Sequence, residues 1–153
     1  MLRQAHIFLP NEDRPAILVP LYHTGDGWIV EQSHPTLLSE WREPVALAQG
    51  VRSVLQQFAL KRMQIRGGGS ARKSSTFRAS GCRTLRDFES TYLRITVCAQ
   101  GESELHFDAY TRPHYEDEIE LRTTLDLCGL DVEIGRKLLR LFNACEKWSD
   151  HVA

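Results

Sequence analysis

Apolar residues come in short runs over the first 31 positions, and connectors rich in Pro, Asn, Asp and Gly separate these runs. The connector residues supply turn geometry, so each run is predicted to form one strand of a meander. The three predicted strands are His6–Leu9, Ala16–Tyr22 and Gly27–Glu31. Residues 32–43 lack this pattern and are interpreted as a loop.

The pattern changes to a helical period at Pro44, a residue well suited to the first position of a helix. Apolar residues then recur at intervals of three and four, the spacing that places them on one helical face. They are Leu47, Val51, Val54, Leu55 and Phe58. The period predicts an amphipathic helix from residue 44 to about residue 62.

The second half of the chain carries three alternating segments and a second helical period. The alternation runs through 90–99, 104–110 and 117–125, and it predicts three further strands. A closing helix is predicted near 132–147, with apolar residues spaced as in the first helix. These residues are Ile134, Leu138, Leu141, Phe142 and Cys145.

The two apolar helical faces superpose when one is shifted by 87 residues along the chain. Any two core helices share such a face, but here three predicted strands also precede each helix. The sequence therefore predicts one α+β domain, residues 1–153, with a largely antiparallel β-sheet of about six strands and two main helices. Its halves, about 1–65 and 85–150, are expected to be pseudo-duplicated β-β-β-α units joined by a basic Gly-rich loop at 66–80.

Composition and charge narrow the classes of function. The 153 residues are 42% hydrophobic, and 19 basic residues nearly balance 20 acidic ones, so bulk electrostatics do not favour a polyanion as partner. No run approaches the roughly 18 apolar residues of a membrane span, and the apolar part of the N-terminal segment is too short for a secretory signal. We therefore expect a cytoplasmic protein with no membrane partner.

The four cysteines are widely spaced and contain no C-x-x-C pair, the arrangement from which structural zinc sites usually take ligands. Cys98 lies in a predicted strand and Cys145 on the apolar face of a predicted helix, so both are interpreted as small core residues. His23 and His34 lie in predicted loops without ligand spacing. No metal and no cofactor are expected.

The stretch Gln64–Arg83 holds three consecutive glycines among basic and hydroxyl residues. A phosphate-binding Walker loop needs G-x-x-x-x-G-K-[ST] between a strand and a helix. Here Arg72 occupies the place of the second glycine, and a predicted helix precedes the loop. The nucleotide-binding interpretation therefore fails in both sequence and context.

Residues 61–86 contain eight basic residues and no acidic one, a composition that can neutralise phosphates. Phe77 is the only aromatic residue of this segment that could stack on a base. A solvated, mobile basic linker is therefore favoured, and nucleic acid is disfavoured as a partner. A small nucleic-acid-binding or RNA-processing protein that uses this segment remains the alternative.

His106 and His114 could serve as the acid and base of a ribonuclease-like enzyme. Strand alternation places His106 on the same face as Asp108 and opposite Phe107. His114 follows Pro113 in a predicted turn, and no third group completes a site. No nucleophile motif of the G-x-S-x-G type is present. The protein is therefore predicted not to be an enzyme, with the ribonuclease-like function as the weaker alternative.

Acidic residues dominate 102–133, where ten carboxylates stand against two arginines, Arg112 and Arg122. One interpretation is a solvated strand edge whose charges discourage edge-to-edge pairing. The other is an acidic patch with an aromatic anchor, suited to the capture of a basic protein. Both interpretations stay open. The candidate contact residues are Asp108, Tyr115, Glu116, Asp117, Glu118 and Glu120.

The segment RDFESTYLRITVCAQGESELHFDAYTR, followed by DVEIGRKLLRLFNAC, resembles the immunity proteins of bacterial contact-dependent growth inhibition systems, the CdiI-like family. In that family an aromatic–acidic pair precedes a V/I-rich strand, and an acidic–apolar–Gly segment starts a helix that ends near a cysteine. Phe88-Glu89, Ile134-Gly135 and Cys145 stand at those places. PTLLSEWREPVALAQGVRSVL is similar to the family's first half, with Ala48 where glycine is usual.

The resemblance spans about 110 residues, and the long basic glycine loop and the tail after Trp148 depart from the family's pattern. It implies a protein that catalyses no reaction. Such a protein would bind and neutralise the C-terminal toxin domain of a cognate CdiA-like effector, often a ribonuclease acting on tRNA. The resemblance implies a 1:1 complex in the cytosol of the producing cell.

Overall fold

The computed structural model describes residues 2–25, 27–61, 74–101, 103–110 and 120–151. Within these ranges the strands are β1 Leu2–Pro10, β2 Ala16–Thr24, β3 Ile29–Glu31, β4 Thr36–Leu38, β5 Ala59–Lys61, β6 Tyr92–Gln100, β7 Glu104–Tyr110 and β8 Glu120–Asp126. They form one sheet in the order β3-β2-β1-β6-β7-β8, and β4 and β5 also pair with β2. Of the pairings, only that of β2 with β5 is parallel among the described strands.

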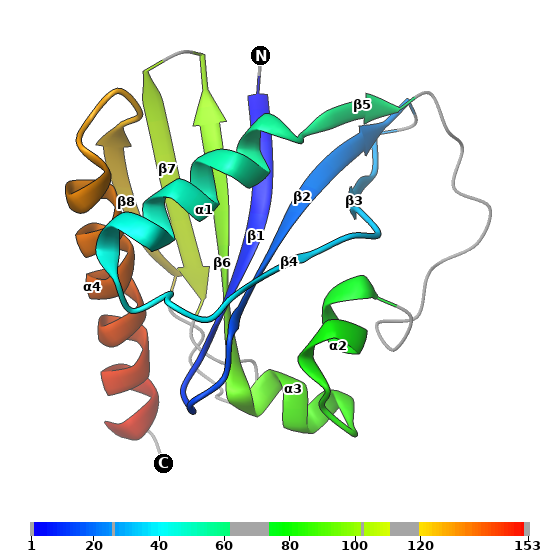
Figure 1. Ribbon diagram of the computed structural model, residues 1–153, viewed down its shortest axis with the longest axis vertical. Helices are drawn as coiled ribbons and strands as arrows, with labels where there is room; N and C mark the ends of the chain where they lie inside the picture. The colour runs from blue at the N-terminus through cyan, green and yellow to red at the C-terminus, as the bar shows by residue number, and fades with distance from the viewer. Residues whose placement is uncertain (1, 26, 62–73, 102, 111–119, 152–153) are drawn as a thin grey trace.

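Two long helices lie side by side on one face of the sheet (Figure 1). They are α1 Pro44–Gln56 and α4 Asp131–His151. Two short helices, α2 Ser75–Ser80 and α3 Leu85–Thr91, pack against the opposite face. None of the described helices combines the length and the apolar character that a membrane crossing needs. The architecture is the predicted α+β class with a largely antiparallel sheet.

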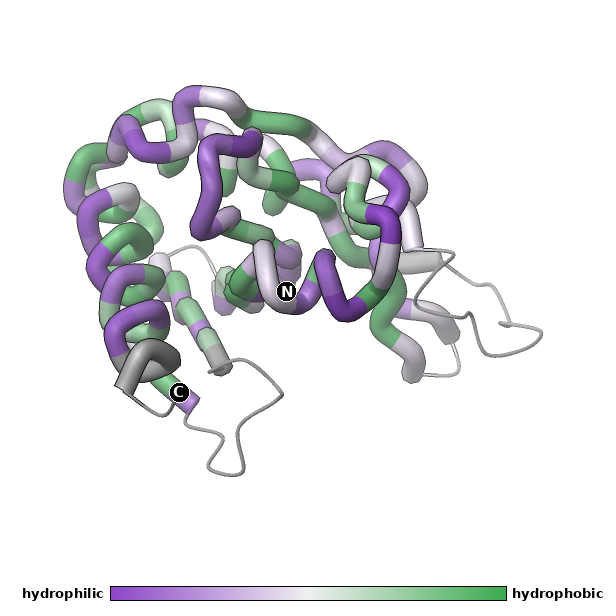
Figure 2. The backbone as a smooth tube through the Cα atoms, turned by 90° about the horizontal axis from the view of Figure 1, so that it is seen from below, coloured by the Kyte–Doolittle hydropathy of each residue, from purple (hydrophilic) through white to green (hydrophobic). Residues whose placement is uncertain are grey.

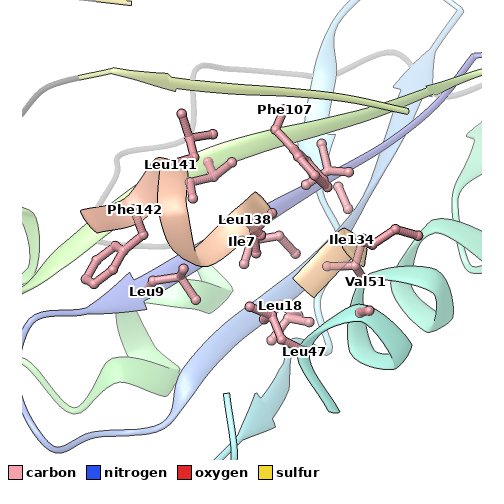
Figure 3. Close-up of a cluster of buried hydrophobic side chains, with 14 of the residues drawn as sticks. Ile7, Leu9, Leu18, Leu47, Val51, Phe107, Ile134, Leu138, Leu141 and Phe142 are labelled. Atoms are coloured by element: carbon pink, nitrogen blue, oxygen red, sulfur yellow. The ribbon is translucent and has the colours of Figure 1, made fainter. Parts of the chain in front are cut away.

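The main core lies between the sheet and the two long helices (Figure 3). Alternation along the strands directs Ile7, Leu18 and Phe107 toward the helices, and none of these side chains is exposed. Polar and apolar residues likewise alternate around α4 (Figure 2), whose apolar side supplies Ile134 and Leu138 to this core. Full burial of one such side chain contributes roughly 1.5–3 kcal/mol, so this layer dominates the stability of the fold.

The two halves of the chain are arranged alike around the central β1–β6 pair. β1 runs antiparallel to β6 over its full length, from Leu2 opposite Gln100 to Pro10 opposite Tyr92. β2 flanks β1 as β7 flanks β6, and each half adds one long helix to the same face (Figure 1). The arrangement agrees with the predicted pseudo-duplication of β-β-β-α units.

The pairing registers agree with this symmetry. Ala16 of β2 lies opposite Leu38 of β4, and Leu105 of β7 lies opposite Leu125 of β8. Leu38 and Leu125 are separated by the same 87 residues that separate the two apolar helical faces. The first half divides its third strand into β3 and β4, whereas β8 of the second half is continuous.

The contact between α1 and α4 is close because one helical position carries no side chain. A Cβ atom added at Gly135 would overlap the backbone carbonyl of Pro44 at the start of α1. Nearby, the Trp41 and Phe142 rings meet edge to face, with centroids 5.5 Å apart. Ala48, the counterpart of Gly135 after the 87-residue shift, is itself fully buried.

Arg52 ties α1 to the connection that leads into α4. Its guanidinium donates to the Asp131 carboxylate at 2.7 Å and to the carbonyls of Leu127 and Gly129 at 2.6 and 2.8 Å. The planar guanidinium can donate to all three acceptors at once, whereas the single ammonium group of a lysine could not make the same set of hydrogen bonds. This contact orients the closing helix against the first one.

Two predicted boundaries in the first half are wrong. Residues 36–38, expected in a loop, form β4, since they pair with the N-terminal part of β2. The first helix ends at Gln56 rather than near residue 62. Phe58 leaves the helical line and packs edge to face on His23, with ring centroids 5.2 Å apart, and the chain then pairs with β2 as β5. Tertiary pairing here outweighs the local helical period.

The expectation of a loop throughout 66–80 is also wrong for its last part. Residues 75–80 form α2, whose N-terminus is capped by the Ser74 hydroxyl, which accepts from the Phe77 N–H. Gly81 closes the helix with a positive φ of 69°. Residues 66–73 of the predicted loop lie outside the described residues.

Candidate protein-binding surface

The sheet face opposite α1 and α4 has two parts with different surroundings. Over β1 and β2 it carries apolar residues that α2 and α3 cover. The covered cluster, as we name it, consists of Phe8, Ile17, Val19, Cys82, Phe88 and Tyr92. Past Tyr92, which belongs to the covered cluster, β6, β7 and β8 carry polar residues on this face, while α2 packs near β2 and α3 leads into the start of β6 (Figure 1).

The polar part is an array of three residues on each of three strands, here named the polar grid. Because directly paired residues of an antiparallel sheet point to the same face, the registers define its members. They are Thr96, Cys98 and Gln100 on β6, Glu104, His106 and Asp108 on β7, and Arg122, Thr124 and Asp126 on β8. Core-facing residues such as Val97 and Phe107 alternate with them along the strands and are fully buried.

An ion pair occupies one end of the grid. The Arg122 guanidinium donates to the Asp108 carboxylate at 2.6 Å and to the Glu120 carboxylate at 3.1 Å. The Asp108 side chain is only 19% exposed, whereas that of Arg122 is 62% exposed. Two of the six predicted contact residues, Asp108 and Glu120, thus come together around one arginine that sequence analysis had counted only as a neighbouring base.

His106 stands at the centre of the grid. As predicted, it shares a face with Asp108 and points away from Phe107. Its Nδ1 lies 3.1 Å from the Thr124 hydroxyl, and its Nε2 lies 3.6 Å from the Glu104 carboxylate. These two contacts fix the orientation of the His106 ring. The second member of the ribonuclease-like pair, His114, lies outside the described residues.

Cys98 belongs to the grid and not to the core, which corrects the interpretation of this residue. It is half-buried and accepts a hydrogen bond from the Gln4 amide, with 3.6 Å between Nε2 and Sγ. Burial raises the pKa of the Cys98 thiol. Cys145 does lie in the main core as predicted, where burial raises its thiol pKa to about 11.

A second polar series links the grid to the part of the face that α2 covers. Gln4 also meets His23, with 2.7 Å between Oε1 and Nε2. Farther along β1, the His6 Nδ1 lies 3.0 Å from the Glu31 carboxylate, which accepts from the buried Thr76 hydroxyl of α2 at 2.8 Å. His23 therefore lies in β2 and takes part in this series, whereas sequence analysis had placed it in a loop.

The remaining predicted residues are divided between described and undescribed parts of the chain. Tyr115, Glu116, Asp117 and Glu118 lie outside the described residues. Arg78, Arg83 and Arg86 of the basic segment are exposed on and beside α2 and α3. Phe77, the one candidate for base stacking, instead packs on Phe88 with ring centroids 5.9 Å apart. Across the described ranges no three His, Cys, Asp or Glu side chains are grouped as metal ligands.

Sequence analysis missed most of the grid. The alternation of 90–99 and 104–110 did place Thr96, His106 and Asp108 on the polar faces of their strands. The partnership of Gln4 with Cys98 joins residues 94 positions apart, and no local pattern indicates it. The available signal was the complete absence of aliphatic residues from one face of three consecutive strands.

Comparison with known proteins identifies the fold. No protein-family profile and no curated protein matches the chain. Among solved structures, a protein of unknown function from Neisseria meningitidis matches with a TM-score of 0.68 and 13% identity, over 95% of this chain and 96% of that one. A chain of the CdiA-CT/CdiI toxin and immunity complex from Yersinia pseudotuberculosis matches with a TM-score of 0.65 and 12% identity. That match covers 95% of this chain and 97% of the other. At these identities the similarity is one of fold.

Proposed function

We propose that the protein is an immunity protein that binds and neutralises the C-terminal toxin domain of a CdiA-like effector. The observation that carries the proposal is the fold shared with a chain of a toxin and immunity complex, over nearly the full length of both chains. The sequence resemblance to CdiI-like proteins adds support and was drawn from residues such as Phe88 and Gly135, which the fold uses in packing.

In this proposal the protein acts by binding its partner and catalyses no reaction. It forms a 1:1 complex in the cytosol, and the toxin domain is a nuclease whose substrate-binding surface is basic. Because nucleases bind polyanions through basic surfaces, an acidic surface on the inhibitor can meet the same residues that the substrate needs. The proposed contact residues are Asp108, Tyr115, Glu116, Asp117, Glu118 and Glu120.

The experiment measures binding to the toxin domain encoded beside this gene, by surface plasmon resonance with the full-length chain. We expect tight 1:1 binding, an association rate that falls as salt rises, and loss of toxicity when the two are coexpressed. Absence of binding together with continued toxicity would contradict the proposed function. Tight, salt-sensitive retardation of a short RNA by this protein alone would favour the nucleic-acid-binding alternative.

A charge reversal tests the acidic contact. The triple variant Asp117→Lys, Glu118→Lys and Glu120→Lys is expected to weaken toxin binding by about 100-fold or more, because like charges then face each other. Folding should be nearly unchanged, since the exposed ion pair of Glu120 with Arg122 contributes at most about 1 kcal/mol. The matched control reverses three exposed acids near the N-termini of the long helices, Glu40, Glu43 and Glu133. An equal loss of binding in both variants would show a nonspecific effect of net charge.

A further inference from the structure

The pseudo-symmetry of the fold makes the covered cluster and the polar grid equivalent surfaces. Ala16 and Leu105 correspond, because each lies opposite a leucine at corresponding positions of the third strand. Stepping along the strands, Ile17 then corresponds to His106 and Val19 to Asp108. The cross-strand partners follow the same rule, since Phe8 lies opposite Ile17 and Cys98 lies opposite His106.

Three apolar positions that α2 and α3 cover in the first half therefore correspond to Cys98, His106 and Asp108 in the second. In the first half the face is completed by the protein's own helices. In the second half the side chains are polar, and neighbouring side chains already hold them. The Asp108 carboxylate is fixed by Arg122, and the His106 ring by Thr124. Groups fixed in this way lose little conformational freedom when a partner binds.

The charge of the grid indicates the chemistry of its partner. The nine residues of the grid carry three carboxylates, on Glu104, Asp108 and Asp126, against the single guanidinium of Arg122, and the next row of the same face adds the exposed Arg94 and Glu120, whose charges cancel. Arg122 already satisfies Asp108, but the Glu104 side chain is 55% exposed and its closest ionic contact among the described residues is His106 at 3.6 Å. The grid thus offers carboxylate, amide and hydroxyl acceptors to a basic surface rich in hydrogen-bond donors.

We propose that the polar grid is the central docking surface for the toxin domain and receives a basic patch of that domain. This inference rests on the proposed function and deepens it. It moves the centre of the interface from the acidic segment between β7 and β8 onto the sheet face itself. An antiparallel sheet can leave one face to water, so the test must separate a docking face from a merely solvated one.

Two lysine substitutions within the grid test the docking. Gln100→Lys and Thr124→Lys each add a long, positively charged side chain at an exposed position on a different strand. With the toxin domain encoded beside this gene as the probe, we expect each to raise the Kd by about 100-fold. The matched control, Asn143→Lys, adds the same side chain at an exposed position of α4 and should change the Kd less than about threefold. Circular dichroism melting of all three variants verifies that each is folded.

A neutral substitution tests the charge of the partner surface. Glu104→Gln keeps the size of the side chain and removes one carboxylate, so a basic partner should associate several-fold more slowly at low salt. Its association rate should also depend less on salt than that of the wild type. An unchanged or faster association would overturn the basic character of the docked patch.

The outcomes separate the two proposals. If both lysine variants fold and bind the toxin domain with the Kd of the wild type, the docking surface is overturned and the proposed function stays intact. Failure of the wild type to bind would overturn both. Selective loss in the two grid variants, with binding retained by Asn143→Lys, is the expected result.

Discussion

The covered cluster and the polar grid occupy equivalent positions on one sheet face, yet they differ in surroundings. Helices bury the first, whereas the second is a polar surface. In the first half, Phe8, Ile17 and Val19 are buried because α2 and α3 cover them. In the second half, the corresponding residues are polar and are held by their neighbours in the sheet. The difference teaches that both halves bury the helical side of the sheet in the same way, whereas the opposite face is an apolar core layer in one half and a polar surface in the other.

The largest expected loss of stability comes from a substitution in the covered cluster. The Phe88 ring lies 5.4 Å from Phe8 and 5.3 Å from Tyr92, centroid to centroid, so Phe88→Ala leaves a cavity. We expect a loss of about 3–5 kcal/mol of unfolding free energy. The comparison variant His106→Ala, in the grid, should cost no more than about 1 kcal/mol. Urea denaturation measures both, and equal losses would contradict the assignment of different roles to the two surfaces.

The next largest effect compares corresponding positions of the two long helices, Gly135 in α4 and Ala48 in α1. Gly135→Ala introduces a Cβ that overlaps the Pro44 carbonyl, so α1 and α4 must move apart, at an expected loss of about 3 kcal/mol. The reciprocal change Ala48→Gly should cost about 1 kcal/mol, mainly through helix propensity. Thermal unfolding of the two variants measures the difference. A tolerated alanine at 135 would mean that the helix contact is looser than described.

The smallest effect concerns the thiols of the two environments. Burial raises the pKa of the Cys145 thiol to about 11 in the folded protein, so the folded state holds the proton more tightly than the unfolded state does. The unfolded thiol ionises first as pH rises, so stability present below about pH 9 is lost progressively up to about pH 11. At pH 10 we expect a loss of about 1 kcal/mol relative to pH 8. Urea midpoints of wild type and Cys145→Ala measure this, since the variant should lack this part of the alkaline slope.

Thiol labelling at pH 8 distinguishes the same environments without a substitution. The exposed Cys128 should react first with a disulfide reagent. Cys98 should follow slowly, because it is half-buried and its pKa is raised, and the buried Cys82 and Cys145 should react only on unfolding. Rapid labelling of Cys98 would show that the grid is more open than its contacts with Gln4 indicate.

The amino-acid sequence alone determined the elements whose pattern is local. The alternation around Ile95 and Phe107 identified two core strands, and the periods through Leu47 and Ile134 identified the two long helices and their common spacing. A residue's own neighbours decide such patterns, because burial of one face imposes a period of two in a strand and of 3.6 in a helix. The pseudo-duplicated α+β architecture followed from them.

Only the tertiary structure decided which strands meet and which face is covered. The pairing of β1 with β6 joins Ile7 to Ile95, and no local period encodes a contact over that separation. Pairing with β2 made strands of residues 36–38 and 59–61, and the hydroxyl-rich segment at 75–80 forms a helix that packs Phe77 on Phe88. The polar grid likewise exists only once three strands are in register, because it is the register that brings Cys98, His106 and Thr124 into one row.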